Sequence, residues 1–174
     1  MKNKFFEVFK MIRADRLLSG ASVFVFIFIV AIASATSLIA QDKVASKSIT
    51  IHQEINFKVS PEKVYNALLD SKQFKDFSGR SAEINPTVGG AFSLFEKHII
   101  GQNVELVPNQ RIVQAWRVVD WPAGIYSIAR FELKSQGDGT QLVFDHIGFP
   151  EGLQTHLADG WQRNYWDLLS KYLK

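Results

Sequence analysis

The stretch LQTHLADGWQRNYWDLLSKYL, residues 153–173, decides the fold of this chain. It contains no proline, and its apolar side chains recur every three or four positions, at 153, 157, 161, 165, 168, 169, 172 and 173. This spacing predicts an amphipathic helix of about 20 residues. The apolar side of so long a helix must be buried against another layer of the domain, and a curved sheet is a layer that fits it.

The residues before this helix are typical of a meander of short strands. Residues 49–59 alternate apolar and polar side chains, which predicts one half-buried strand. Gly137-Asp138-Gly139 is the clearest hairpin signal that follows. Turn residues, including those at 99–101, separate the further candidate strands, which cover 82–84, 91–98, 101–107, 111–119, 126–134 and 141–147.

Two short helices are expected between the first strand and the meander. Ser60-Pro61-Glu62 supplies an N-cap residue, a first-turn proline and a first-turn acid, so a helix is predicted over 61–70. A second helical piece over 72–77 ends near Gly79. The sequence therefore predicts an α+β fold in which six to seven antiparallel strands curve around the C-terminal helix. A strongly curved sheet of this kind tends to leave a cavity beside the helix.

Charge is distributed unevenly along the chain. The 174 residues carry a formal net charge of +3, with a pI of about 9.1. Residues 1–19 hold five basic and two acidic groups, whereas residues 50–174 hold 13 basic and 14 acidic groups, a net of −1. The near-neutral domain argues against a nucleic-acid partner. The absence of cysteine excludes a disulfide scaffold, a thiolate nucleophile and a cysteine-ligated metal.

Residues 20–40, GASVFVFIFIVAIASATSLIA, carry no charge at all. About 20 helical residues span a bilayer core, so residues 21–40 are predicted to enter a membrane. Two alternatives stay open: a signal peptide cleaved after Ala33-Ser34-Ala35 or after Ala40, and an uncleaved anchor. Both place the domain outside the cytoplasm, because Lys and Arg stay on the cytoplasmic side. The chain then divides into a signal or anchor segment 1–40, a linker 41–49 and a domain 50–174.

Several motifs resemble one known family. They are IxFKVSPEKVYNALLD at 55–70, VGGAFSLF at 88–95, VELVPNQRIVQAWR at 104–117, FDHIGFPEG at 144–152 and GWQRNYW at 160–166. In their order and spacing the chain resembles the homologues of the activator of heat-shock protein 90 ATPase, in the START-like (SRPBCC) helix-grip superfamily. The resemblance covers about residues 50–174. It implies a helix-grip domain, and it implies a protein partner of the chaperone class.

Seven side chains are candidates to line the expected cavity. Strand alternation puts His146 on the same face as Leu142 and Phe144, while Trp161 and Tyr165 lie on the apolar side of the C-terminal helix. Such aromatic side chains can line a pocket for an apolar molecule, and the alternative is that they only fill the core. The seven candidates are Phe92, Trp116, Phe131, Phe144, His146, Trp161 and Tyr165.

Catalytic and metal chemistry have few candidate residues. His146 is the one catalytic candidate, because a histidine in an apolar cavity can act as a general base. The alternative is a structural histidine that has hydrogen-bond partners in the core, and Asp145 points to the opposite face. Glu96 and His98 are expected on one strand face, where they could supply only half of a metal site, because no third ligand lies near them in the sequence. Neither a metal nor a cofactor is expected.

Three functions agree with these features. The first is a non-enzymatic domain, membrane-tethered or exported, that binds a hydrophobic small molecule in the cavity. The second is a protein-interaction module related to the heat-shock protein 90 ATPase activator, as the resemblance implies. The third is a cyclase-type or hydrolase-type enzyme that uses His146, since some helix-grip relatives act inside their cavity. The first agrees best with a near-neutral domain rich in aromatic side chains.

Overall fold

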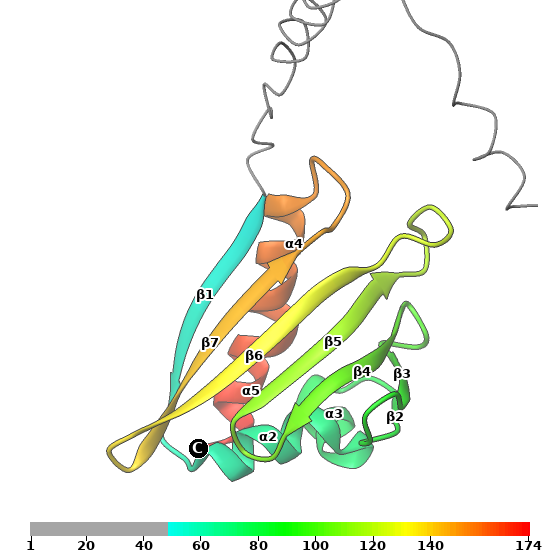
Figure 1. The fold of residues 1–174 in the computed structure, drawn as a ribbon. Coiled ribbons are helices and arrows are strands. Elements are labelled where there is room, and N and C mark those ends of the chain that lie inside the picture. The colour runs from blue at the N-terminus through cyan, green and yellow to red at the C-terminus, as the bar shows by residue number, and fades with distance from the viewer. Residues whose placement is uncertain (1–48) are drawn as a thin grey trace, which may run out of the picture. The chain divides into compact units, whose positions relative to one another are not determined.

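A computed structural model describes residues 49–174, which form a curved antiparallel sheet packed against helices (Figure 1). The seven strands lie in the order β1-β7-β6-β5-β4-β3-β2. They are β1 (Thr50–Phe57), β2 (Ala82–Ile84), β3 (Ala91–Leu94), β4 (Ile99–Val107), β5 (Arg111–Val118), β6 (Ser127–Gln136) and β7 (Gly139–Ile147). The helices are α2 (Pro61–Leu69), α3 (Ser71–Ser78), α4 (Gln154–Trp161), a π-helical turn over Gln162–Trp166, and α5 (Asp167–Tyr172).

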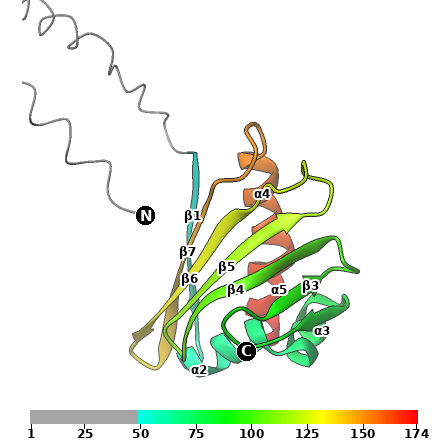
Figure 2. The same ribbon diagram turned by 45° about the vertical axis from the view of Figure 1, so that its right-hand side comes forward.

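The predicted α+β fold is confirmed. The C-terminal helix runs along one face of the sheet, and α2 and α3 lie together near one end of that helix (Figures 1 and 2). Consecutive strands from β2 to β7 are neighbours in the sheet, whereas β1 pairs with β7 and forms the edge opposite to β2. Two short helices follow β1, as the sequence predicts.

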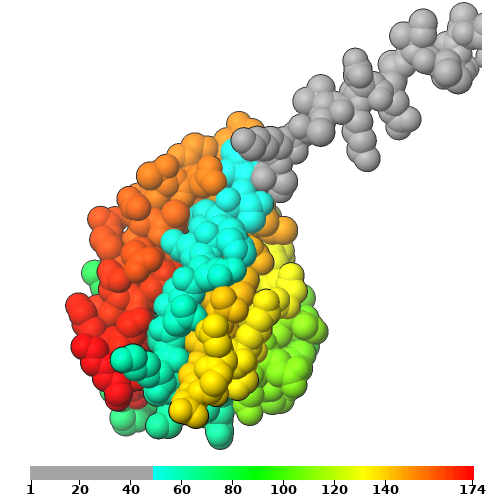
Figure 3. Space-filling model, turned by 90° about the vertical axis from the view of Figure 1, so that its left-hand side faces the viewer, coloured from blue at the N-terminus to red at the C-terminus, as the bar shows by residue number. Residues whose placement is uncertain are grey.

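Strand β1 is fastened to the C-terminal helix as well as to the sheet. In Figure 3 it lies between that helix on one side and the β6–β7 hairpin on the other. Gln53 makes the link, because its Nε2 donates to the Ala158 carbonyl at 3.2 Å and its Oε1 accepts from Trp166 Nε1 at 2.7 Å. These bonds tie an edge strand to the element that the sheet surrounds.

The core is complete within the described residues. Along β6 the buried side chains alternate with exposed ones, so that Ala129, Phe131 and Leu133 face inward while Ile128 and Arg130 face outward. The core cluster draws its members from Ile51 through Leu173, and the described residues 49–174 lie within one compact unit. We therefore expect this unit to hold its shape without the N-terminal segment.

Two details of the predicted elements are wrong. The strand expected over 91–98 ends at Leu94, because Phe95, Glu96 and Lys97 all adopt positive φ angles, of 55°, 56° and 67°. The turn expected at 99–101 is instead the start of β4. The C-terminal helix has the predicted extent, but one turn in its middle is π-helical, with an extra residue.

The membrane segment and linker predicted for residues 1–40 and 41–49 fall outside the described residues, apart from Ile49. Within residues 49–174 no helix is both long enough and apolar enough to cross a bilayer.

Candidate functional site

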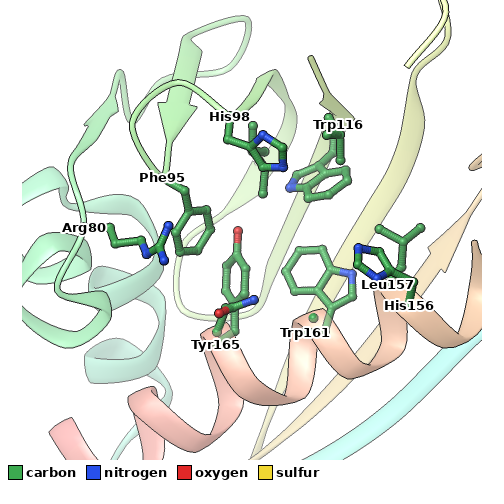
Figure 4. Close-up of a pocket in the computed structure, with 12 residues that line it drawn as sticks. Arg80, Phe95, His98, Trp116, His156, Leu157, Trp161 and Tyr165 are labelled. Carbon is green, nitrogen blue, oxygen red and sulfur yellow. The ribbon is translucent and has the colours of Figure 1, made fainter. Parts of the chain in front are cut away.

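A cavity of about 180 Å³ opens between the sheet and the C-terminal helix (Figure 4). Strands β4 and β5 supply one wall, the β3–β4 turn a second, and the helix from α4 into the π turn a third. The cavity is lined by Arg80, Phe95, His98, Ile99, Trp116, Val118, His156, Leu157, Gly160, Trp161, Asn164 and Tyr165.

The β3–β4 turn places one aromatic wall. Ser81 binds this turn at two points, since its carbonyl accepts from the Phe95 N–H at 2.9 Å and its hydroxyl accepts from the Glu96 N–H at 3.2 Å. A left-handed backbone at a non-glycine residue costs roughly 1–2 kcal/mol, so these contacts hold a strained turn in place. The result is that the Phe95 ring packs edge-on against Tyr165, with centroids 5.4 Å apart.

Glu96 and His98 do not lie on one strand face, and that expected position is corrected. Both lie in the turn rather than on a strand face. The Glu96 carboxylate is 3.6 Å from Arg80, whereas His98 Nδ1 is 4.0 Å from Asp120. No three histidine, aspartate or glutamate side chains between residues 49 and 174 converge as metal ligands would.

Aromatic rings form the floor of the cavity. Trp116 and Trp161 have ring centroids 5.5 Å apart, and Trp161 and Tyr165 have centroids 4.3 Å apart. All three side chains are almost fully buried, at 2–4% exposure. Such close contacts between rings make a rigid apolar surface that fits a flat molecule.

Two polar atoms in this aromatic floor are poorly satisfied. Trp116 Nε1 and the Tyr165 hydroxyl are buried, and neither makes a hydrogen bond of ordinary geometry within the described structure. Burial raises the pKa of Tyr165 well above its ordinary range, so the hydroxyl stays protonated; a weak hydrogen bond from the Trp116 indole to the Tyr165 oxygen acts in the opposite direction, and it leaves the Tyr165 proton without an acceptor. Leaving a buried polar group unpaired costs about 1–3 kcal/mol, which makes these two atoms the most unusual feature of the site.

His146 does not line this cavity, and its imidazole is fully used by its neighbours. Trp161 Nε1 donates to His146 Nδ1 at 3.0 Å, and His146 Nε2 lies 2.7 Å from Ser127 Oγ. The Ser127 hydroxyl donates to the Trp116 carbonyl at 2.8 Å, so its oxygen must accept from the Nε2–H of a neutral imidazole. Burial lowers the pKa of His146 to about 3, which agrees with that assignment. His146 is therefore a structural residue in the arrangement described, with no lone pair free for a general base.

The rim of the cavity is basic. Arg80, His98 and His156 line it, and no acidic side chain does. The nearest carboxylates are Glu96 beside Arg80 and Asp120 beside His98, and both lie outside the lining. The lining itself therefore presents basic side chains and no carboxylate, while Glu96 and Asp120 partly offset their charge from outside it.

The structure brings three of the seven predicted cavity residues together: Trp116, Trp161 and Tyr165. The other four are placed elsewhere, which corrects their expected position. Phe92 and Phe131 border a void of about 10 Å³, too small for any ligand, and Phe92 also lines two open hollows of about 550 and 540 Å³ away from this cavity. Phe144 and His146 are fully buried in the core. Sequence reasoning missed nine lining residues: Arg80, Phe95, His98, Ile99, Val118, His156, Leu157, Gly160 and Asn164.

The sequence of this chain matches a known protein family. The family described as "Activator of Hsp90 ATPase homolog 1-like protein" matches residues 58–174. The chain belongs to that family. This confirms the resemblance that the motifs at 55–70 and 144–166 indicate.

Curated relatives of this Hsp90 ATPase activator homologue are longer than it is. The human activator of 90 kDa heat shock protein ATPase homolog 1 is 26% identical over 125 residues, which are 72% of this chain and 36% of that protein. The homologue from Dictyostelium discoideum is 28% identical over 126 residues, 72% of this chain and 32% of its own. The chain thus spans about a third of the length of these relatives.

Two solved structures share the domain over nearly their whole length. An HSP90 activator from Plasmodium falciparum is 28% identical, with a TM-score of 0.69 over 72% of this chain and 96% of that one. The Aha1 dimer from Colwellia psychrerythraea is 21% identical, with a TM-score of 0.62 over 72% of this chain and 96% of that one, and it shows the common fold.

Proposed function

We propose that residues 50–174 form a non-enzymatic domain that binds a small, largely apolar molecule in the cavity between the sheet and the C-terminal helix. The observation that carries this proposal is a space of about 180 Å³ walled by seven aromatic and aliphatic side chains, with the polar side chains of Arg80, His98, His156 and Asn164 beside them. A cavity of about 150 Å³ is enough to hold benzene, whereas drug-sized ligands occupy roughly 300–1,000 Å³. The occupant is therefore compact, of the size of one substituted ring, and not a whole sterol or phospholipid.

A non-catalytic role is favoured by the state of His146. Both of its ring nitrogens are engaged, one by Trp161 and one by Ser127, and its low pKa keeps it neutral. A general base needs a free lone pair within reach of the substrate, and His146 offers none to the cavity.

Binding can be measured with the protein's own tryptophans. All four tryptophans of the chain lie between residues 116 and 166, and two of them line the cavity. Full-length protein in phosphatidylcholine nanodiscs is titrated with toluene or indole, with empty discs as the control for partition into lipid. We expect a saturable change in tryptophan fluorescence and a bound mass in native mass spectrometry. No saturable change with any compound of this size would refute the proposal.

We further propose that residues 21–40 hold this domain at a membrane or direct its export. One feature of the described residues supports it. The start of β1, the end of β7 and the β5–β6 connection lie at one end of the sheet. Six large apolar side chains gather at that end, each 36–47% exposed: Ile49, Val119, Ile125, Tyr126, Ile128 and Ile147. An apolar end beside the incoming chain fits a domain that works close to a bilayer.

The location can be tested by cell fractionation and protease protection. We expect the full chain in the membrane fraction, and we expect protease added outside the cytoplasm to digest the domain. Mass spectrometry of the N-terminus separates a cleaved signal from an anchor. A domain that stays in the cytoplasmic soluble fraction and is protected from protease would overturn this part of the proposal.

A second candidate function is the binding of a protein partner. It is favoured by the family and by the solved HSP90 activator from Plasmodium falciparum, of which this chain covers 96%. We propose on that basis a co-chaperone-like module that regulates an Hsp90-type ATPase. The ATPase rate of a purified Hsp90 is measured with increasing full-length protein. A saturable rise supports the module, and an unchanged rate at saturating protein removes it.

A further inference from the structure

The Trp116 indole and the Tyr165 hydroxyl lack a well-placed acceptor, and this identifies what the cavity is missing. An indole N–H can only donate. Near Trp116 Nε1 lies the Tyr165 oxygen, with which it makes no hydrogen bond of ordinary geometry, and the Tyr165 hydroxyl, which stays protonated, has no acceptor for its own proton. Both side chains line the same cavity. A molecule that brings an oxygen to both donors would satisfy them at once.

Two members of the basic rim, Arg80 and His98, lie on the side of the cavity toward which the Tyr165 hydroxyl points, whereas His156 lies beside Leu157 on the other side (Figure 4). In Figure 4 the Tyr165 hydroxyl points toward the side that carries Phe95 and His98, with Arg80 nearby, and the Trp116 nitrogen faces the cavity. The guanidinium of Arg80 and two imidazoles line the opening, with no carboxylate among the lining residues. Two neutral donors and a basic rim together favour a negatively charged oxygen over a neutral one.

We propose that the cavity is selective for a small aromatic carboxylate, whose carboxylate accepts hydrogen bonds from Trp116 Nε1 and the Tyr165 hydroxyl. The proposal rests on the ligand-binding function above and names its ligand class. The ring of the ligand lies on the flat surface formed by Trp161 and its neighbours. Because the two donor atoms expose almost no surface, the ligand must part the Trp116 and Tyr165 rings slightly, and two charge-assisted hydrogen bonds offset that cost.

Four probes with the same ring but different polar groups separate the effect of an acceptor oxygen on affinity from the effect of negative charge. Benzoate, acetophenone, toluene and benzylamine are titrated into full-length protein in phosphatidylcholine nanodiscs, and tryptophan fluorescence is corrected with empty discs. We expect benzoate to bind most tightly, acetophenone less tightly, and toluene at least roughly tenfold more weakly than benzoate, since each bond to a charged acceptor is worth about a factor of ten. Benzylamine should not bind measurably.

Variants test the assigned donors. Tyr165→Phe should weaken benzoate binding roughly tenfold and leave toluene binding unchanged, because it removes only the hydroxyl. Trp116→Phe is the second test of the pair and should act in the same direction. The matched control is Tyr172→Phe, at a tyrosine outside the cavity lining, which should change neither affinity. Arg80→Gln should weaken benzoate binding and leave acetophenone binding unchanged.

The outcomes separate this inference from the function on which it rests. If no probe binds, the proposed ligand-binding function fails. If toluene binds as tightly as benzoate and acetophenone, the cavity binds ligands but the donor pair is satisfied by water, and the inference is overturned. If acetophenone binds more tightly than benzoate, the preference for a carboxylate is wrong. Benzoate binding that is unchanged in both Tyr165→Phe and Trp116→Phe removes the assigned contacts.

Discussion

The unpartnered hydroxyl of Tyr165 leads to a prediction of unusual sign: Tyr165→Phe should make the ligand-free protein more stable. The Tyr165 side chain is 4% exposed, and its ring packs against Phe95, Phe74 and Trp161. The substitution keeps the ring and removes a single oxygen. Ring packing is therefore conserved, and the buried hydroxyl that lacks a partner is eliminated.

The size of the effect follows from the desolvation of that hydroxyl. A buried hydroxyl without a partner costs about 1–3 kcal/mol, and the small void left by one oxygen returns part of this cost. A net gain of about 1 kcal/mol remains. For a domain of about 126 residues the entropy of unfolding at the midpoint is roughly 0.26 kcal/mol per degree, so the expected rise in Tm is about 4 °C.

Thermal and urea unfolding, followed by circular dichroism without ligand, measure this change. Tyr172→Phe, at a side chain that is 39% exposed, serves as the control and should stay within about 0.5 kcal/mol of the parent. A Tm that falls in Tyr165→Phe would show that the hydroxyl has a stabilising partner, such as a bound water. The description of Tyr165 as an unpaired donor would then be refuted.

Three further predictions concern the buried histidine and the sheet. Burial lowers the pKa of His146 to about 3, so the native state binds fewer protons than the unfolded state below pH 6.5. The contribution of His146 to the free energy of unfolding is fully present above pH 6.5, and at pH 5 this free energy should be about 2 kcal/mol lower, which corresponds to a fall in Tm of about 8 °C. His146→Gln should reduce this dependence of Tm on pH. Ser127→Ala removes the acceptor of the His146 Nε2–H and should cost about 2 kcal/mol in urea unfolding, and a neutral result would contradict the assigned tautomer. Gly101→Ala should cost about 2–3 kcal/mol, because a Cβ at this position would overlap the Ala115 carbonyl and the Phe92 ring, whereas Gln102→Ala on the exposed side should be nearly neutral.

Local patterns predicted the sheet because each strand is half buried. Strand β1 shows it well: Ile51 and Phe57 are buried, and His52 and Glu54 are exposed, as alternation requires. The same rule correctly turned His146 inward and Asp145 outward, where Asp145 accepts a hydrogen bond from His52 at 2.7 Å. The alternation of side chains along a strand depends only on the local backbone, so it can be predicted without knowing the contacts that distant residues make.

The site was harder to predict because it depends on distant contacts. The left-handed turn at 95–97 contains no glycine or asparagine, and it is held by Ser81, far along the chain. The residues next to Phe95 in the sequence therefore give no indication that its side chain lines the cavity. The partners of His146 are likewise 15 and 19 residues away, at Trp161 and Ser127. The sequence pattern could predict that the His146 ring faces inward, but it could not show that both ring nitrogens form hydrogen bonds with other side chains.

The π turn was missed for a different reason. A spacing of three to four residues selects 157, 161, 165 and 169 as the buried side of the helix, and it leaves Trp166 on the flank. In the structure Trp166 is 1% exposed and donates to Gln53. The extra residue in the turn at 162–166 brings two consecutive aromatic side chains, Tyr165 and Trp166, to the buried side.

Because of this π turn, the buried side of the C-terminal helix points in a different direction before the turn than after it. The half before it presents Leu157 and Trp161 to the cavity, and the half after it presents Tyr172 to Phe77 of α3, with ring centroids 6.3 Å apart. Removing one residue from a regular helix rotates everything downstream by about 100°. Here the π turn takes up one extra residue, and Leu157 before it and Leu169 after it are both buried. The turn also connects the pocket to α3, because Tyr165 lines the pocket and packs edge-on against Phe74 of α3, with ring centroids 5.6 Å apart. A substitution that removes the Tyr165 ring is therefore expected to change both the pocket and the packing of the helix on α3.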